Sequence, residues 1–499
     1  MIMKKRLLAL TLGVSMAAGM LTGCGGGSGD ASTSTPAADA GTEAPAADAG
    51  TEAPAADAGS TAATGDFDWK AYEGTELDVL FSEHTYADAV EAKLADFEAL
   101  TGIKVNYSSM PEGNYFDKLN VELTSHSGTP DVFMTGAYQS WEYASAGNLE
   151  PLENYISDAS LTNPDYNYDD FIPGVIDALK WDCVPGHSVG AGSQWALPMG
   201  WEVNILTYNK RILEENNLQP PKTAEELLEV SKALHEFNGS GTYGLAVRGL
   251  PDWGTIHPAY MSMYSTWGAK DFEVVDGKLV SQVDSPEAIA MTEYWVELVK
   301  EGGAPQWSTY GWELAGADLG AGKAAMMWDA DRGGYTQNVA GASAESGNLA
   351  FGMIPYPESA GKTEADMKSN LWTWSMAMNA DSSKKEAAWY FMQYFTGPEF
   401  MLWSGTEGAC TDTPRLSVLN SDEYKAAVSD AEGYFDAFNK VQETASIFFT
   451  PQPYFSETTT EWAKTLQELV VGNKYSSVEE AMKELKATMD AIVSDLEVE

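Results

Sequence analysis

The stretch ELDVLFSEHTYADAVEAKLADFEALTGIKVNY, residues 76–107, decides the fold class. Residues 76–81 favour a buried strand, and residues 87–100 place apolar side chains at close to the helical period of 3.6. Thr101-Gly102 is typical of a helix end, and a second strand is expected over residues 103–107. The stretch therefore predicts a strand, a helix and a second strand.

The same alternation continues along the chain. Residues 115–125 suit a helix, and residues 131–134 suit a short strand introduced by Gly128-Thr129-Pro130. Strands and helices in this order predict a parallel sheet with helices on both faces. Such sheets bind ligands in the crevice beyond the carboxyl ends of their strands.

Later helices have clear start signals. A Ser or Thr followed three residues later by Glu indicates an N-terminal capping box, and Pro after Ser indicates a first turn. These signals stand at Thr223 with Glu226, Ser285-Pro286, Ser383 with Glu386, and Ser477 with Glu480. Trp295, Trp389 and Trp462 fall within the expected helices and are interpreted as core residues.

Composition excludes two classes of protein. The chain has 499 residues, 44% of them hydrophobic, which is too apolar for a wholly disordered chain. Its formal net charge of -45 repels phosphates, so nucleic-acid binding is not expected. A chain of this length predicts two or three domains.

The first 23 residues predict a signal peptide. Three basic residues (4–6) precede an uncharged, mostly apolar run over residues 7–20, which is too short to span a bilayer as a helix. Leu21-Thr22-Gly23-Cys24 resembles the lipobox of bacterial lipoproteins. That resemblance implies cleavage before Cys24, a diacylglycerol on its sulfur, and attachment to the lipid bilayer at the outer face of the cytoplasmic membrane.

Residues 24–66 predict a linker. A nine-residue repeat, marked by prolines 36, 45 and 54, is rich in Ala, Gly and Asp and contains no Lys or Arg. Such a composition cannot bury a core, so we expect a disordered acidic spacer. Export also permits a disulfide between Cys183 and Cys410, and the sequence leaves open whether it forms or both thiols stay free.

Several motifs together resemble the extracellular solute-binding proteins of carbohydrate ABC importers, the maltodextrin- and polyol-binding group. The motifs are FEALTGIKV (97–105), PDVF (130–133) with AGNLEPL (146–152), LP (197–198) through LTYNK (206–210) to PKTAEEL (221–227), GKAAMM (322–327) and KKEAAW (384–389). The resemblance covers nearly all of residues 68–499. It implies an α/β, two-lobe periplasmic-binding-protein-like fold of type II, with a ligand cleft between the lobes.

The resemblance also implies how the chain divides. The N-terminal lobe is expected to hold residues 67–202 and 349–396, and the C-terminal lobe residues 203–348 and 397–499. The crossing at Trp201 to Val203 is expected to act as a hinge, because hinges absorb backbone rotation while lobes move as rigid bodies. We expect a monomer that captures a sugar or polyol and delivers it to the permease subunits of an ABC transporter.

Aromatic and charged side chains gather where the family has its cleft. An aromatic face covers the C–H face of a sugar, while charged groups hydrogen-bond its hydroxyls. The predicted ligand-binding residues are Glu83, Trp201, Glu202, Arg248, Trp253, Trp328, Asp329, Arg332, Trp372, Trp374 and Arg415. For each of them core packing or a structural ion pair is the competing interpretation.

The alternative function is an exported carbohydrate-active hydrolase, which also needs aromatics and paired carboxylates. With 74 acidic residues, some carboxylate pair is inevitable and does not discriminate. The sequence contains no G-x-S-x-G, H-E-x-x-H or C-x-x-C motif, and its five histidines lack metal-ligand spacing. We therefore expect a binding protein, not an enzyme, with no cofactor and no metal.

Overall fold

The computed structural model describes residues 66–429, 431 and 433–498. The predicted signal peptide, the lipobox with Cys24 and almost all of the predicted linker lie outside these residues. Among the described residues, no helix combines the length and the apolar character needed to cross a membrane.

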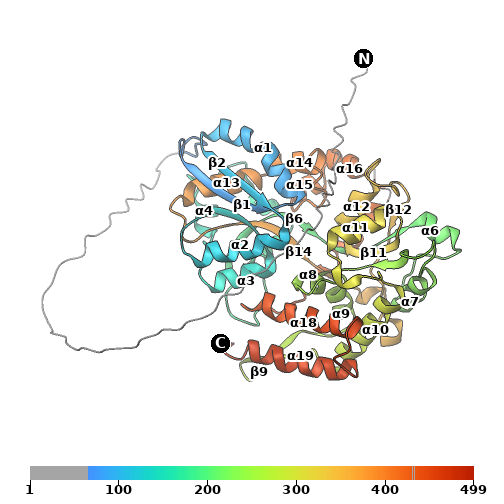
Figure 1. Ribbon diagram of the computed structural model, residues 1–499. Helices are drawn as coiled ribbons and strands as arrows, with labels where there is room; N and C mark the ends of the chain where they lie inside the picture. The colour runs from blue at the N-terminus through green and yellow to red at the C-terminus, as the bar shows by residue number, and fades with distance from the viewer. Residues whose placement is uncertain (1–65, 430, 432, 499) are drawn as a thin grey trace, which may run out of the picture. The chain divides into compact units, whose positions relative to one another are not determined.

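The first sheet has five strands in the order β2-β1-β3-β14-β6. Figure 1 labels β1, β2, β6 and β14. Strand β1 pairs in parallel with β2 and with β3, whereas β14 runs antiparallel to β3 and β6. The strands are β1 Glu76–Ser82, β2 Lys104–Met110, β3 Val132–Gly136, β6 Ala196–Glu202 and β14 Trp372–Met378. The alternation predicted for residues 76–134 is confirmed, with α1 Thr85–Thr101 and α2 Glu112–Thr124 between the strands.

The second sheet has four strands in the order β12-β7-β11-β8. Strand β11 is parallel to β8 and antiparallel to β7, which also pairs antiparallel with β12. The strands are β7 Asn204–Asn209, β8 Tyr243–Ala246, β11 Ala324–Ala330 and β12 Leu349–Phe351. Every residue of β8 and β11 is buried, as expected of strands covered on both faces.

Helices and small two-stranded ladders complete the fold. In Figure 1 the C-terminal helices α18 and α19 lie next to each other and close to α10. The remaining helices are α3 Ala137–Ser145, α4 Glu153–Ser157, α5 Pro173–Asp177, α6 Lys210–Glu215, α7 Ala224–Ala233, α8 Trp253–Thr255, α9 Met261–Trp267, α10 Pro286–Gly302, α11 Trp312–Gly320, α12 Asp331–Asn338, α13 Lys385–Phe395, α14 Pro398–Thr406, α15 Leu416–Leu419, α16 Asp422–Val428, α17 Tyr434–Gln442, α18 Phe455–Val470 and α19 Val478–Ile492. The ladders are β4 Lys180–Trp181 with β5 Ser193–Gln194, β9 Phe272–Val275 with β10 Lys278–Ser281, and β13 Ser369–Asn370 with β15 Ala445–Ser446.

Most predicted helix ends are confirmed. Gly102 adopts a left-handed conformation (φ 73°) and ends α1, where its backbone N–H donates to the carbonyl of Glu98. The side chains of Thr223, Ser285 and Ser477 accept from the first turns of α7, α10 and α19. The expected cap at Ser383 is wrong, because α13 begins at Lys385 after Lys384, which has no side-chain capping bond.

The chain passes from the first sheet to the second at Val203, between β6 and β7. This is the crossing that the sequence predicts. The backbone N–H of Val203 donates to Oδ1 of Asp331 (3.1 Å), and its carbonyl accepts from the backbone N–H of Asp331 (2.9 Å). The crossing is therefore fastened to the start of α12.

Two of the predicted lobe boundaries need correction. Strand β12 begins at Leu349 and pairs with β7, so it belongs with the second sheet rather than with the N-terminal lobe. Residues 397–415 are expected in the C-terminal lobe, yet α14 packs beside α13, and Cys410 lies against the carbonyl of Thr85. Pairing and packing with distant segments, which local patterns do not encode, decide both boundaries.

The cysteine alternatives are settled by the structure, since Cys183 and Cys410 are both free. The core interpretation of Trp295, Trp389 and Trp462 is confirmed, because each is at most 1% exposed.

Candidate functional site

A cavity of about 140 Å³ lies where the strands of both sheets end, and we call it the central cavity. His84 and Glu112 follow β1 and β2, Glu202 ends β6, Arg248 follows β8, and Asp329 lies near the end of β11. Trp372 and Trp374 come from the start of β14, which runs antiparallel and therefore begins at the same edge. The site thus obeys the expected rule that ligands bind beyond the carboxyl ends of strands.

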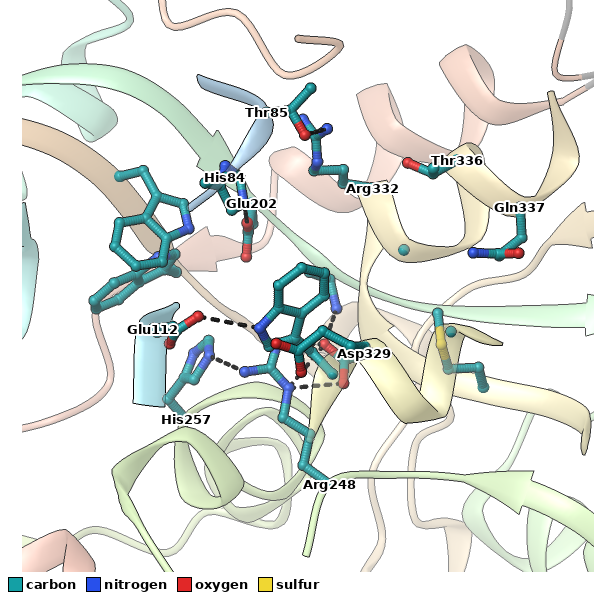
Figure 2. A pocket seen from close by; sticks show the side chains of 18 of the residues that line it. His84, Thr85, Glu112, Glu202, Arg248, His257, Asp329, Arg332, Thr336 and Gln337 are labelled. Atoms are coloured by element: carbon teal, nitrogen blue, oxygen red, sulfur yellow. Dashed lines mark hydrogen bonds and ion pairs between the residues drawn. The ribbon is translucent and has the colours of Figure 1, made fainter. Parts of the chain in front are cut away.

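A buried ion pair forms the floor of the central cavity. The Arg248 guanidinium donates from Nε to Oδ2 of Asp329 (2.8 Å) and from Nη2 to Oδ1 (2.6 Å), as Figure 2 shows. The side chains of Arg248 and Asp329 are 9% and 4% exposed, so each charge is stabilised by the other rather than by water. Burial opposes the charge of Arg248, but Asp329 outweighs it and raises the pKa of the guanidinium.

His257 extends this pair. Its Nε2 lies 3.3 Å from Nη1 of Arg248. Burial, together with the positive charge of Arg248, holds the pKa of His257 well below its ordinary value, so the imidazole is neutral.

Glu202 and His84 lie side by side at the wall of the cavity, 3.9 Å apart between Oε1 and Nε2 (Figure 2). Burial raises the pKa of Glu202 well above its ordinary value, and the nearby Asp412 adds to the effect. Burial also lowers the pKa of His84, and Arg332 lowers it further. The neutral forms of both groups are therefore favoured. The contact between Glu202 and His84 is one between an uncharged carboxyl group and an uncharged imidazole, not an ion pair.

Arg332, on α12, provides the second guanidinium. Its Nη2 donates to the Thr85 hydroxyl, which stands at the start of α1, and its guanidinium lies over the ring of Tyr86. Its Nη1 is 3.9 Å from Oδ1 of Asp412, too far for a hydrogen bond, and has no hydrogen-bond partner among the described residues. The Nη1 group of Arg332 is therefore a hydrogen-bond donor without a partner at the cavity wall.

Aromatic rings enclose the cavity. Trp372 and Trp374 lie two residues apart on β14 and point to the same side of the sheet. The ring centroids of Trp253 and Trp372 are 4.9 Å apart. The indole N–H of Trp312, on α11, donates to Oε2 of Glu112 (3.0 Å) at the N-terminus of α2. These rings supply apolar faces beside the polar groups.

The structure brings seven of the eleven predicted residues to the central cavity. They are Glu202, Arg248, Trp253, Asp329, Arg332, Trp372 and Trp374.

Four predicted residues do not line the cavity. Trp201 and Trp328 precede Glu202 and Asp329 on their strands, so strand alternation turns them away. Trp201 donates to the carbonyl of Thr413 and packs on Phe438, and Trp328 packs near Trp295.

Glu83 and Arg415 also lie elsewhere. Glu83 is exposed, one residue before His84. Arg415 is fully buried, donates to the carbonyls of Thr396 and Asn167, and stacks on Phe171. Its role is structural.

Sequence reasoning missed several lining residues, among them His84, Thr85, Glu112, His257, Trp312, Glu313, Thr336 and Gln337. His84 and Glu112 each stand two residues beyond a strand of the predicted parallel sheet, so the carboxyl-end rule could have found them. Nothing local distinguishes His257 or Trp312 from an ordinary helix residue.

Comparison with known proteins identifies one family and several related solute-binding proteins. Residues 82–401 match the family described as bacterial extracellular solute-binding protein. The chain is 38% identical over 415 residues to the erythritol/L-threitol-binding protein of Mycolicibacterium smegmatis, covering 83% of this chain and 86% of the relative. It is 25% identical over 364 residues to the mannitol-binding protein of Pseudomonas aeruginosa, covering 72% and 77%.

Solved structures are similar in fold. An ABC transporter solute-binding protein from Agrobacterium vitis, with bound D-mannitol, superposes with a TM-score of 0.70 at 22% identity, covering 84% of this chain and 98% of the other. One from Agrobacterium radiobacter in complex with ribitol gives a TM-score of 0.71 at 20% identity, covering 84% and 99%. The predicted α/β, two-lobe fold is confirmed.

Proposed function

Because the chain belongs to the family of bacterial extracellular solute-binding proteins, we propose that it captures a short neutral polyol in the central cavity for an ABC importer. Because members of this family bind solutes and are not enzymes, the alternative of an exported carbohydrate-active hydrolase is set aside. The observation that carries the proposal is the buried Arg248–Asp329 pair, in which the guanidinium neutralises the carboxylate at the floor of the cavity.

The polar groups suit hydroxyls. A protonated Glu202 can both donate and accept, as can the hydroxyl of Thr85, while Arg332 donates only. A hydroxyl likewise donates and accepts, so a polyol can satisfy these groups without bringing a charge into a buried site. Trp372 and Trp374 would cover its carbon chain.

The volume favours a small solute. The central cavity measures about 140 Å³, below the roughly 300–1,000 Å³ of sites for drug-sized ligands. Two relatives are named as an erythritol/L-threitol-binding protein and a mannitol-binding protein, and both names support a polyol as the ligand. We propose erythritol or threitol as the first ligands to test.

A panel experiment tests this function. Wild type is heated with erythritol, L-threitol, ribitol, D-mannitol and maltose, because a ligand raises the unfolding midpoint in proportion to ln(1 + [L]/Kd). We expect a short polyol to give the largest shift and to be recovered intact by chromatography. A panel in which only maltose raises the midpoint would contradict the proposal, and so would cleavage of the bound ligand.

The location follows from the proposed lipobox and linker. Cys24 would carry the lipid, residues 24–66 would hold the folded part away from the bilayer, and the protein would work as a monomer. Cys24→Ala is expected to release the protein into the medium or to leave an uncleaved precursor. A Cys24→Ala chain that is fully processed and still fractionates with membranes would contradict the anchor.

We propose that the two lobes, with residues 349–351 and 397–415 placed as described above, close around the ligand by a hinge rotation at Val203. Contacts between Arg332 and Thr85 and between Trp312 and Glu112 join elements of the two sheets at the cavity. Ligand is expected to lower the radius of gyration and to change Trp fluorescence. Unchanged solution scattering at saturation with a verified ligand would contradict closure.

A further inference from the structure

A second cavity of about 380 Å³ adjoins the central cavity and shares five lining residues with it: Glu112, Arg248, Trp253, Trp312 and Glu313. Helices α2 and α3 line one side of it, and the start of α11, the segment before α8 and the start of α18 line the other. We call it the acidic cavity, since its wall carries the carboxyl groups of Glu112, Asp117, Glu142, Asp252 and Glu313.

The charges of the acidic cavity are not balanced. Among the described residues that line it, Arg248 is the one cation, and the guanidinium is already engaged by Asp329. Burial raises the pKa of Glu112 and of Glu142 to about 7. Asp117 and Glu313 have neither a hydrogen bond nor an ion pair to any residue within the described parts of the chain. Both side chains are exposed, and carboxylates without a paired cation favour binding of a positive ligand.

An independent observation points to a ligand at the same place. Gln139, on α3, lines the acidic cavity and is only 2% exposed. Neither Nε2 nor Oε1 of its amide has a hydrogen-bond partner among the described residues. A buried amide without partners costs free energy, and a polar group bound in the cavity would supply the missing bonds.

The arrangement suits an organic cation rather than a metal ion. Within the described residues, no cluster of three or more His, Cys, Asp or Glu side chains is arranged to hold a metal. The rings of Phe116, Trp253 and Trp312 line the same cavity. Aromatic faces attract ammonium groups and also cover hydrocarbon.

We propose that the acidic cavity is a second binding site, for an aliphatic ammonium compound. The cation would lie among Asp117, Glu313 and Glu112, its remaining polar end would bond the amide of Gln139, and its carbon chain would pack on the rings. Glu112 and Glu313 also line the central cavity, whereas Asp117 and Gln139 line the acidic cavity alone. Variants at Asp117 and Gln139 therefore test this site separately from the polyol proposed for the central cavity.

The test uses three probes of equal chain length: 1,4-butanediol, 4-amino-1-butanol and 1,4-diaminobutane. Isothermal calorimetry of the wild-type protein at physiological ionic strength is expected to show saturable binding of one diamine per chain. The affinity should rise along the series, with about tenfold or more between diol and diamine, because hydrogen bonds to ionised groups are the stronger ones.

Variants separate this site from general attraction of amines to an acidic protein. Gln139→Leu leaves the charge unchanged and is expected to weaken diamine binding about fivefold or more. Asp117→Asn should weaken it as well. Glu91→Gln, which removes an exposed charge on α1, should leave it unchanged. Circular dichroism and the unfolding midpoint verify that each variant is folded.

Diamine binding no tighter than that of the diol would overturn the site. Equal weakening by Glu91→Gln and Asp117→Asn, or no effect of Gln139→Leu in a folded chain, would also overturn it. Failure of the polyol panel with persistence of Gln139-dependent diamine binding would overturn only the proposed polyol function, so the two failures are distinguishable.

Discussion

The central and acidic cavities share part of their walls but differ in how charge is handled. In the central cavity Asp329 is matched by Arg248, and Glu202 is favoured as the neutral acid. The acidic cavity is lined by five carboxyl groups and one guanidinium that is already engaged; Glu112 and Glu313 line both cavities, whereas Asp117, Glu142 and Asp252 line the acidic cavity alone. If both proposals hold, charge balance rather than the kind of side chain separates the proposed site for neutral solutes from the proposed site for cations.

The largest expected effect comes from breaking the Arg248–Asp329 pair. Arg248→Met leaves a buried carboxylate without a partner, so we expect a loss of about 3–5 kcal/mol in the free energy of unfolding. Urea denaturation measures it. Arg248→Met combined with Asp329→Leu should recover much of the stability but none of the polyol binding.

The matched control is the exposed pair of Lys232 and Glu297, whose atoms are 2.6 Å apart. Lys232→Met should leave the urea midpoint unchanged, since exposed pairs add little. If Arg248→Met and Lys232→Met lowered the free energy of unfolding equally, burial would not explain the contribution of the Arg248–Asp329 pair to stability.

The next effect separates a neutral acid from a charged one at Glu202. If the carboxyl group binds a hydroxyl in its protonated form, Glu202→Gln should keep most of the affinity. Glu202→Leu removes the hydrogen bonds and should cost about 1–3 kcal/mol, or roughly 5- to 150-fold in Kd. Calorimetry with the best polyol measures both, and equal losses in the two variants would argue for an ionised Glu202.

Much of the fold could be predicted because its rules are local. The segment 76–134 shows its strands and helices through periodicity and turn residues, and Gly102 ends α1 as expected. The lobe boundaries could not be predicted, because the pairing of β12 with β7 joins residues about 140 positions apart in the chain. No local pattern encodes that pairing.

The candidate site was predictable to the level of the segment. Trp201-Glu202 and Trp328-Asp329 each bring one residue to the central cavity and turn the other into the core, because neighbours on a strand face opposite ways. Arg415 looked like a ligand group, yet it is wholly buried between carbonyls and rings. Only side-chain direction, which depends on the sheet, distinguishes these cases.

A smaller effect concerns Glu112, which lines both cavities. Burial raises its pKa to about 7 in the folded chain, above the ordinary value near 4.3. Its contribution to stability is therefore full below about pH 4.3 and is lost as the pH rises through about 7.

Glu112→Gln should flatten the pH dependence of the unfolding free energy over this interval by about 1–3 kcal/mol. Asp117→Asn, which changes an exposed carboxylate on the next turn of α2, is the control and should not flatten it. Identical pH profiles for wild type and Glu112→Gln would show that Glu112 titrates normally.

The division of labour between the cavities is tested most directly by calorimetric titration of erythritol, or of the polyol that ranks first in the panel, into three proteins. We predict saturable binding to wild type with one ligand per chain, at least about tenfold weaker binding to Asp329→Asn, and unchanged binding to Asp117→Asn. Absence of binding to wild type, or a loss in Asp117→Asn as large as that in Asp329→Asn, would contradict the account.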